Sequence, residues 1–284
     1  MPVAAVMWSL LPLFAFGFGG DRIARSVRRL PPAAQLLLPG LFSVPYGLLP
    51  GQNRAAWLAL YLALPILVAF LLRLAQQEDP QQRGHWLDFA VLFGLGLAVD
   101  LRWLESAWPP HFGMLGKLML LDTALYGFTV IRPLANVGFD LRIRGDDVKL
   151  GLRELIFYAP IAVPLGLVLG FLHWHGGFPP PGSAATALAF TFFFIALPEE
   201  IYFRGWLQNL LERRMGARTS LCLTSLIFGL SHFNKRAAHF NWRYVVLATL
   251  AGIFYGRAWR QRRRVAASAI THTLVDAIWS LWLQ

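Results

Sequence analysis

The chain has 284 residues, of which 56% are hydrophobic and only 14% are charged, and its formal net charge is +11. Soluble globular proteins carry about 25% charged residues, so this composition excludes a disordered chain, a disulfide scaffold and an ordinary soluble enzyme. It predicts an all-α, polytopic transmembrane helical bundle of about ten spans, within a range of eight to ten, at about 20 residues each.

Apolar segments divide the chain into ten predicted spans. In chain order they cover residues 2–19, 33–50, 55–73, 87–101, 117–131, 154–173, 183–203, 219–233, 244–258 and 266–283. The loops on one side hold 20 of the 26 basic residues, which predicts that both termini lie on the non-cytoplasmic side. This bias supports a span at 117–131 despite Lys117 and Asp122. Because the basic residues follow the loops, we expect no nucleic-acid partner.

The longest polar interval, Phe139–Arg153, divides the sequence near residue 150. The predicted spans before this interval carry few ionisable residues, whereas the spans after it carry several. We therefore expect an N-terminal transmembrane region of about five spans at residues 1–150, without a motif that indicates its role. Residues 151–284 are expected to form the functional core.

Two adjacent carboxylates, Glu199 and Glu200, follow Pro198 in the seventh predicted span. A charged side chain inside a span costs about 2.5–3.5 kcal/mol on insertion scales, so two of them need a compensating reason. Glu200 and Arg204 stand four residues apart and can pair on one helix face, while Glu199 points away from that pair. The topology places these residues near the cytoplasmic end of the span, where solvated interfacial glutamates are the simpler interpretation.

Two histidines lie in the later spans, each with a partner four residues away. Phe228 and His232 share a helix face at the end of the eighth span, and His272 and Asp276 share one in the tenth. Each pair alone is also consistent with core packing or a polar contact between helices. Together with Glu199 they predict ionisable groups that face the bundle interior. Such a cluster can supply a general base and polarising groups around one water, which favours hydrolysis.

In order and spacing, these three motifs resemble those of the CAAX-protease and bacteriocin-processing family. Its members are intramembrane proteases that include the type II CAAX prenyl endopeptidases. The resemblance covers roughly residues 150–284. It implies an intramembrane endopeptidase that acts on a membrane-delivered peptide or protein substrate.

The resemblance also implies a role for each motif residue. Glu199 is similar to the general base that activates water, and His232 to the group that assists it. His272 and Asp276 are similar to the pair that stabilises the oxyanion of the tetrahedral intermediate. The supporting residues that this resemblance implies are Glu200, Arg204 and Phe228.

Asp276 departs from the family pattern, which usually has Asn at this position. An amide can donate a hydrogen bond to an oxyanion, whereas a carboxyl group can do so only when protonated. Three explanations stay open: burial keeps Asp276 protonated, Asp276 orients His272, or a metal is bound. The resemblance favours a metal-free mechanism without a cofactor. In a metal-dependent mechanism the residue types would suit zinc, and the ligands would be Glu199, His232, His272 and Asp276.

Two further readings of the sequence remain. A non-catalytic member of the same family would act in bacteriocin immunity or as a membrane scaffold. A transporter would show inverted repeats, and we find no repeat in the sequence. Arginine outnumbers lysine by 23 to 3, which is typical of a GC-rich genome and favours an integral protein of a prokaryotic inner membrane. The sequence indicates neither the identity of the substrate nor the oligomeric state.

Overall fold

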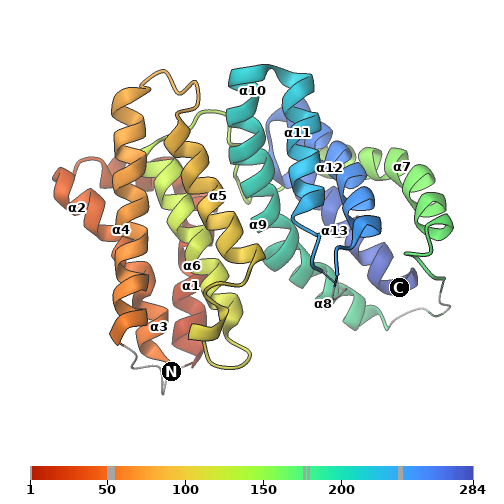
Figure 1. Cartoon of the computed structure of the whole chain (residues 1–284), viewed down its shortest axis with the longest axis horizontal. Helices are drawn as coiled ribbons and strands as arrows, with labels where there is room; N and C mark the ends of the chain where they lie inside the picture. The colour runs from red at the N-terminus through yellow and green to blue at the C-terminus, as the bar shows by residue number, and fades with distance from the viewer. Residues whose placement is uncertain (1, 50–54, 175–176, 178–179, 236–238, 284) are drawn as a thin grey trace. The chain divides into compact units, whose positions relative to one another are not determined.

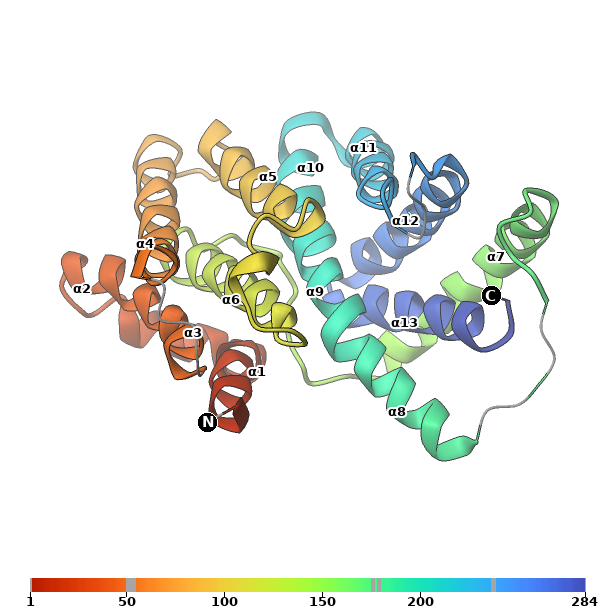
Figure 2. The ribbon, with the colours of Figure 1, turned by 60° about the horizontal axis from the view of Figure 1, so that its bottom comes forward.

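The computed structural model describes residues 2–49, 55–174, 177, 180–235 and 239–283. Among these residues the regular secondary structure is entirely helical and no strand is present, which agrees with the all-α prediction. The chain separates into two compact units, Met1–Ala135 and Asn136–Gln284 (Figures 1 and 2).

The first unit is a bundle in which α4 packs against α5 and α6, and α1 packs against α6. Its helices are α1 (Pro2–Val27), α2 (Pro32–Leu37), η1 (Leu38–Ser43), α3 (Val44–Leu48), α4 (Ala55–Glu78), α5 (Trp86–Asp100), η2 (Glu105–Ala107), α6 (Gly113–Tyr126) and η3 (Gly127–Ile131).

The second predicted span, 33–50, is divided into three short helical segments, α2, η1 and α3. Pro39 and Pro45 lie in the first turns of η1 and α3. Proline lacks a backbone N–H and therefore interrupts the hydrogen-bond ladder of a continuous helix. None of the three segments alone approaches the roughly 20 residues that a span requires. Residue 50 lies outside the described residues.

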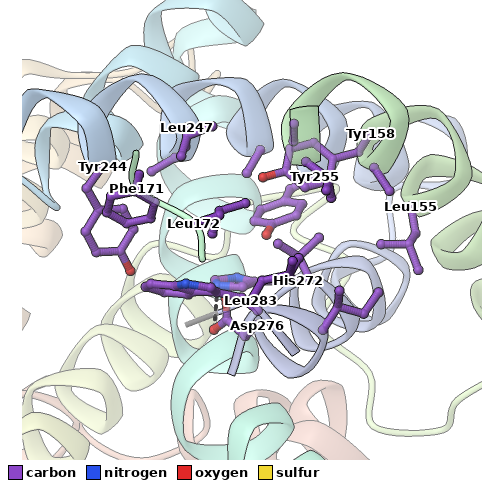
Figure 3. Close-up of a pocket in the computed structure, with 18 of the residues that line it drawn as sticks. Leu155, Tyr158, Phe171, Leu172, Tyr244, Leu247, Tyr255, His272, Asp276 and Leu283 are labelled. Atoms are coloured by element: carbon purple, nitrogen blue, oxygen red, sulfur yellow. Dashed lines mark ion pairs between the residues drawn. The ribbon is translucent and has the colours of Figure 1, made fainter. Parts of the chain in front are cut away.

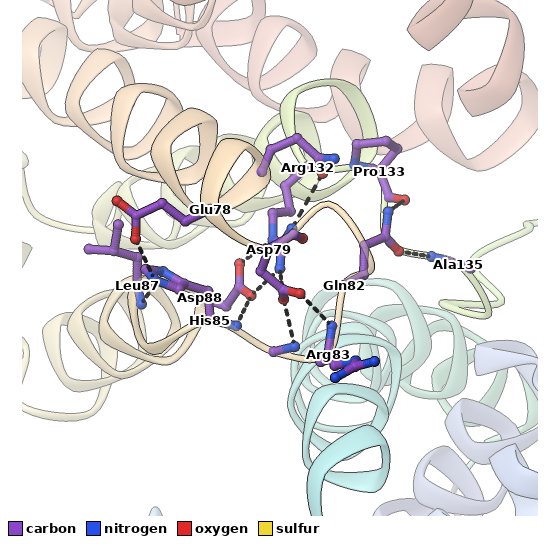
Figure 4. Close-up of polar contacts among 12 residues, drawn as sticks. Glu78, Asp79, Gln82, Arg83, His85, Leu87, Asp88, Arg132, Pro133 and Ala135 are labelled. Carbon is purple, nitrogen blue, oxygen red and sulfur yellow. Dashed lines mark hydrogen bonds and ion pairs between the residues drawn. The ribbon is translucent and has the colours of Figure 1, made fainter.

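A buried ion cluster joins three helices of the first unit (Figure 4). The fully buried guanidinium of Arg132 lies 2.7 Å from a carboxylate oxygen of Asp79 and 2.7 Å from one of Asp88. Asp88 also accepts a hydrogen bond from the backbone N–H of His85 at 2.8 Å. Because Asp79 follows α4, Asp88 lies in the first turn of α5 and Arg132 follows η3, the cluster holds these three helix ends together.

The second unit is built around α12, which packs against α7, α11 and α13. In chain order its helices are α7 (Gly145–Val168), α8 (Pro181–Thr191), η4 (Phe192–Ala196), α9 (Leu197–Glu200), η5 (Ile201–Gln208), α10 (Asn209–Met215), α11 (Ala217–Leu230), α12 (Trp242–Arg262) and α13 (Val265–Trp282).

The helices α8 to α10 follow one another as one long helical run (Figure 2). This run widens to π-helical geometry at η4 and η5, on both sides of α9. Wider turns of this kind are rare in proteins. Where they do occur, they often lie at functional sites. They lie directly beside Glu199 and Glu200, the two carboxylates that the sequence singles out.

The length of this run corrects the predicted end of the seventh span. The sequence predicts an end at residue 203, whereas the apolar helix covers Gly182–Met215. Glu200 and Arg204 lower the local hydropathy, but both side chains are buried and pair with each other. The helix therefore continues through them, and Glu199 lies near the middle of this apolar helix.

Within the described residues, five helices are long and apolar enough to cross a membrane. They are Val3–Val27, Ala55–Glu78, Gly113–Ile131, Gly145–Val168 and Gly182–Met215. The third of them covers the predicted span at 117–131, which the charge bias supports. Length and composition thus agree with a polytopic membrane protein, whereas the count of about ten spans is not confirmed.

Close packing between α11 and α12 depends on glycine. A Cβ atom added at Gly229 would lie 2.6 Å from the carbonyl oxygen of Val245, and one added at Gly252 would lie 3.0 Å from Cα of Ser225. Both distances are shorter than ordinary van der Waals contact, so a side chain at either position would push the helices apart. This close approach brings Phe228 of α11 next to Tyr255 of α12, with 5.8 Å between ring centroids.

Candidate functional site

A buried ion pair between Glu200 and Arg204 forms the base of the site. Both side chains are fully buried, and Nε of Arg204 lies 3.2 Å from Oε2 of Glu200. Arg204 also donates a hydrogen bond from Nη2 to the carbonyl oxygen of Gly252 at 3.1 Å. Its guanidinium carbon lies 4.8 Å from the centroid of the Phe228 ring. The pair at four-residue spacing is therefore present and is held against α11 and α12.

His272 lies among three carboxylates. Its Nδ1 is 2.9 Å from Oε1 of Glu200, and its Nε2 is 3.5 Å from Oδ2 of Asp276 and 3.9 Å from Oε2 of Glu199. An ionised carboxylate only accepts hydrogen bonds, so Nδ1 carries the proton in the contact with Glu200. Glu200 thereby fixes the ring orientation and turns Nε2 toward the other two carboxylates.

Glu199 has different surroundings from its neighbour Glu200. Its side chain is 26% exposed, whereas that of Glu200 is fully buried. Oε1 of Glu199 lies 3.8 Å from Nζ of Lys235, in the loop that follows α11. This contact and the 3.9 Å contact with His272 are both longer than a hydrogen bond. The Glu199 side chain is therefore partly open, although Oε2, the oxygen that faces His272, is itself buried without a hydrogen-bond partner.

Phe228 connects the two histidines. Its ring centroid lies 4.9 Å from that of His232 and 5.7 Å from that of His272. Nδ1 of His232 lies 2.8 Å from the carbonyl oxygen of Phe228. Because a carbonyl oxygen only accepts, Nδ1 carries the hydrogen, and Nε2 of the neutral ring keeps a lone pair. His232 is also within electrostatic range of Glu199.

A cavity lies beside His272, between α7, α12 and α13 (Figure 3). It measures about 660 Å³ including its open mouth. His232, His272 and Asp276 line it together with Tyr158 and Tyr255, and most of its other lining side chains are aliphatic or aromatic. Glu199 is not among the described residues that line the cavity. It is next to His272, which does line the cavity, and faces Nε2 of that residue. The cavity can thus hold an apolar segment next to the polar cluster.

The structure brings the predicted residues together in the second unit, from α9, η5, α11, the turn after α11, and α13. They are Glu199, Glu200, Arg204, Phe228, His232, His272 and Asp276. Two further residues at the site, Lys235 and Tyr255, were not predicted. A lysine in a polar loop and a tyrosine in an apolar helix are common in membrane proteins, so neither residue stands out in the sequence. The one local feature that distinguishes Tyr255 in the sequence is its position between Gly252 and Gly256.

The four residues considered as zinc ligands do not gather as a metal-binding group in this arrangement. Among the described residues, no group of three or more His, Cys, Asp or Glu side chains could hold a metal ion. Nδ1 of His272 contacts Glu200 and Nδ1 of His232 contacts the carbonyl oxygen of Phe228, so each histidine presents Nε2 to the site.

Comparison with known proteins agrees with the motifs. Residues 181–278 match the family model described as type II CAAX prenyl endopeptidase Rce1-like. This match confirms the resemblance that the three motifs indicate, and it covers α8 to α12 and most of α13. No curated protein and no solved structure shows a significant match to the chain.

Proposed function

We propose that this integral membrane protein is an intramembrane endopeptidase that hydrolyses a peptide bond in a membrane-delivered peptide or protein. The match of residues 181–278 to a protease family supports the reaction class. One observation carries the mechanism: Nε2 of His272 lies between Asp276 and Glu199 while Nδ1 is held by Glu200. An orienting carboxylate, an imidazole and a partly open carboxylate therefore meet at one point beside an apolar cavity.

Glu199 acts as the general base in this proposal. Its carboxylate accepts a proton from a water molecule as the water oxygen bonds to the carbonyl carbon of the substrate. The electron pair of the carbonyl double bond moves to oxygen and forms an oxyanion. The carbon–nitrogen bond then breaks, the proton passes from Glu199 to the leaving nitrogen, and a carboxylic acid and an amine are released. One water is consumed.

The histidines have separate roles. Nε2 of neutral His232 accepts a hydrogen bond from the attacking water and orients it toward the carbonyl carbon. His272, in its protonated form, donates from Nε2 toward the oxyanion. Asp276 lies 3.5 Å from this nitrogen, which favours the explanation that Asp276 orients His272. Glu200 and Arg204 hold His272 from the opposite side.

The activity can also be assigned to one part of the chain and to one cellular membrane. The six residues of the mechanism all lie in the second unit, so we assign catalysis to the C-terminal part, predicted at residues 151–284. The mechanism needs no metal or other cofactor. The asymmetry of the basic loops and the excess of arginine support a multi-pass protein of a prokaryotic inner membrane.

The test compares the parent protein with Glu199→Gln and His232→Ala in lipid vesicles. Two reporter peptides are used, one ending in a farnesylated CAAX sequence and one of the same sequence without the farnesyl group. A detergent-solubilised peptide mixture, read by mass spectrometry of new termini, covers other sequences. Glu105→Gln, a half-exposed carboxylate of the first unit, is the matched control.

We expect cleavage by the parent and by the control, and loss of at least about 100-fold in kcat for Glu199→Gln, because a general base contributes about 10²–10⁴-fold. The ratio of rates on the two reporters shows whether the farnesyl group is recognised. Cleavage that persists in both folded variants overturns the assignment. Failure of the parent to produce new termini in any probe overturns it as well and favours the non-catalytic alternative.

A further inference from the structure

Tyr255 has an unusual position beside His272. Its ring stacks on the imidazole with 4.6 Å between centroids and 17° between planes (Figure 3). The side chain is 1% exposed, and it lines the cavity on the α12 side. The guanidinium carbon of Arg204 lies 5.5 Å from the centroid of the same ring. Tyr255 thus contacts both ends of the polar cluster, although it belongs to none of the three motifs.

The oxyanion needs a hydrogen-bond donor that Asp276 does not supply as a carboxylate. An ionised carboxylate has acceptor oxygens only, and its negative charge repels a developing oxyanion. A phenolic hydroxyl, in contrast, is a neutral O–H donor at physiological pH. The cavity lining contains such donors in its tyrosines, and Tyr255 stacks directly on the catalytic imidazole.

The surroundings of Tyr255 indicate which side of the imidazole its hydroxyl faces. Tyr255 lines the cavity together with His272 and Asp276, and Figure 3 shows its hydroxyl on the side of these two residues. Asp276 faces Nε2 of His272, and Glu200 faces Nδ1. The hydroxyl therefore faces the cavity beside His272 and Asp276.

We propose that Tyr255 is a catalytic residue whose hydroxyl donates a hydrogen bond to the oxyanion of the tetrahedral intermediate. This inference rests on the proposed function and adds a donor to it. No proton is transferred to the substrate by Tyr255; the O–H bond stays intact while the negative charge is present on the carbonyl oxygen.

The test is Tyr255→Phe, measured on the farnesylated reporter peptide or on whichever peptide of the mixture the parent cleaves in a Glu199-dependent way. Phenylalanine keeps the stacked ring and the buried apolar area and removes only the hydroxyl. Tyr202→Phe is the matched control, because Tyr202 is half-buried and does not line the cavity. Tyr158→Phe removes the hydroxyl of a second cavity residue. Thermal unfolding of each variant is recorded in the same detergent.

Loss of one oxyanion donor costs about 10²–10³-fold in kcat. We therefore expect at least about a 100-fold fall in kcat for Tyr255→Phe, with KM changed by less than about threefold and the melting temperature retained. Tyr202→Phe should keep the parent rate, and Tyr158→Phe should lose less than Tyr255→Phe. A kcat within about threefold of the parent for Tyr255→Phe, or a larger loss for Tyr158→Phe, overturns the inference. If Glu199→Gln cleaves as the parent does, the proposed function itself fails, whatever Tyr255→Phe does.

Discussion

Oε1 of Glu200 lies 2.9 Å from Nδ1 of His272, although the two residues are 72 positions apart in the sequence. The contact joins α9 to α13, and both side chains are buried. Oε2 of the same carboxylate faces Nε of Arg204 at 3.2 Å. One carboxylate therefore compensates a buried guanidinium and orients an imidazole, so its removal should affect both stability and activity.

Glu200→Ala should lower the free energy of unfolding by about 3–5 kcal/mol, because it leaves the charge of Arg204 buried without its carboxylate. It should also abolish cleavage, because the orientation of His272 is lost. Unfolding by denaturant in detergent measures the first effect. Replacing both charges, as in Glu200→Gln with Arg204→Met, should recover part of the lost stability. A double variant that is less stable than Glu200→Ala would contradict this account of the pair.

The ion cluster of the first unit predicts a dependence of stability on pH. Burial raises the pKa of Asp79, but hydrogen bonds from the backbone N–H of Arg83 and the guanidinium of Arg132 outweigh burial and hold this pKa below its ordinary value. A carboxyl group with a lowered pKa in the folded state stabilises the fold fully above its unfolded pKa of about 3.9. This contribution is lost as the pH falls through the folded pKa.

Asp79→Asn should therefore be less stable than the parent at neutral pH, and the difference should narrow as the pH falls below about 4. Melting temperatures of both proteins, recorded in one detergent from neutral to acidic pH, measure this difference. A difference that stays constant over the whole range would show that the charge of Asp79 does not stabilise the fold.

Chelation tests the metal-free mechanism. The donor atoms of Glu199, His232, His272 and Asp276 do not gather as metal ligands in the described structure, so we expect cleavage of the reporter peptide to be unchanged after dialysis against EDTA. Elemental analysis of the active protein should find less than one metal ion per chain. Loss of cleavage on chelation, with recovery on addition of zinc, would instead support the metal-dependent mechanism.

The fold class and the three motifs could be predicted because charged side chains are rare in apolar helices and costly there. Glu200 and Arg204 stand out for this reason, and their four-residue spacing predicts their pairing. The contact of Glu200 with His272 could not be predicted, because it depends on how α9 packs against α13. Helical spacing relates residues within one helix and contains no information about a partner on another.

The end of the seventh span, the π-helical turns and the role of Tyr255 could not be predicted either. Hydropathy indicates an end near residue 203, because a sequence window averages over Glu200 and Arg204 without knowing that they neutralise each other. No residue pattern in this segment predicts the π-helical turns beside α9. Tyr255 resembles any other aromatic residue of an apolar helix, and only the tertiary structure places its ring against His272.

The close approach of α11 and α12 gives the last prediction. Gly229 immediately follows Phe228, and a methyl group at Gly229 would meet Thr249 and the carbonyl oxygen of Val245. Gly229→Ala should therefore destabilise the protein by about 1–3 kcal/mol, as overpacking does, and should slow cleavage because Phe228 and His232 shift. Gly94→Ala is the matched control, since no atom outside its own helix lies within 4 Å of the added methyl group. This second change should stabilise the protein by about 0.4–1 kcal/mol through the loss of unfolded-state freedom. Equal stability of the two variants would mean that α11 and α12 do not pack as closely as the structure indicates.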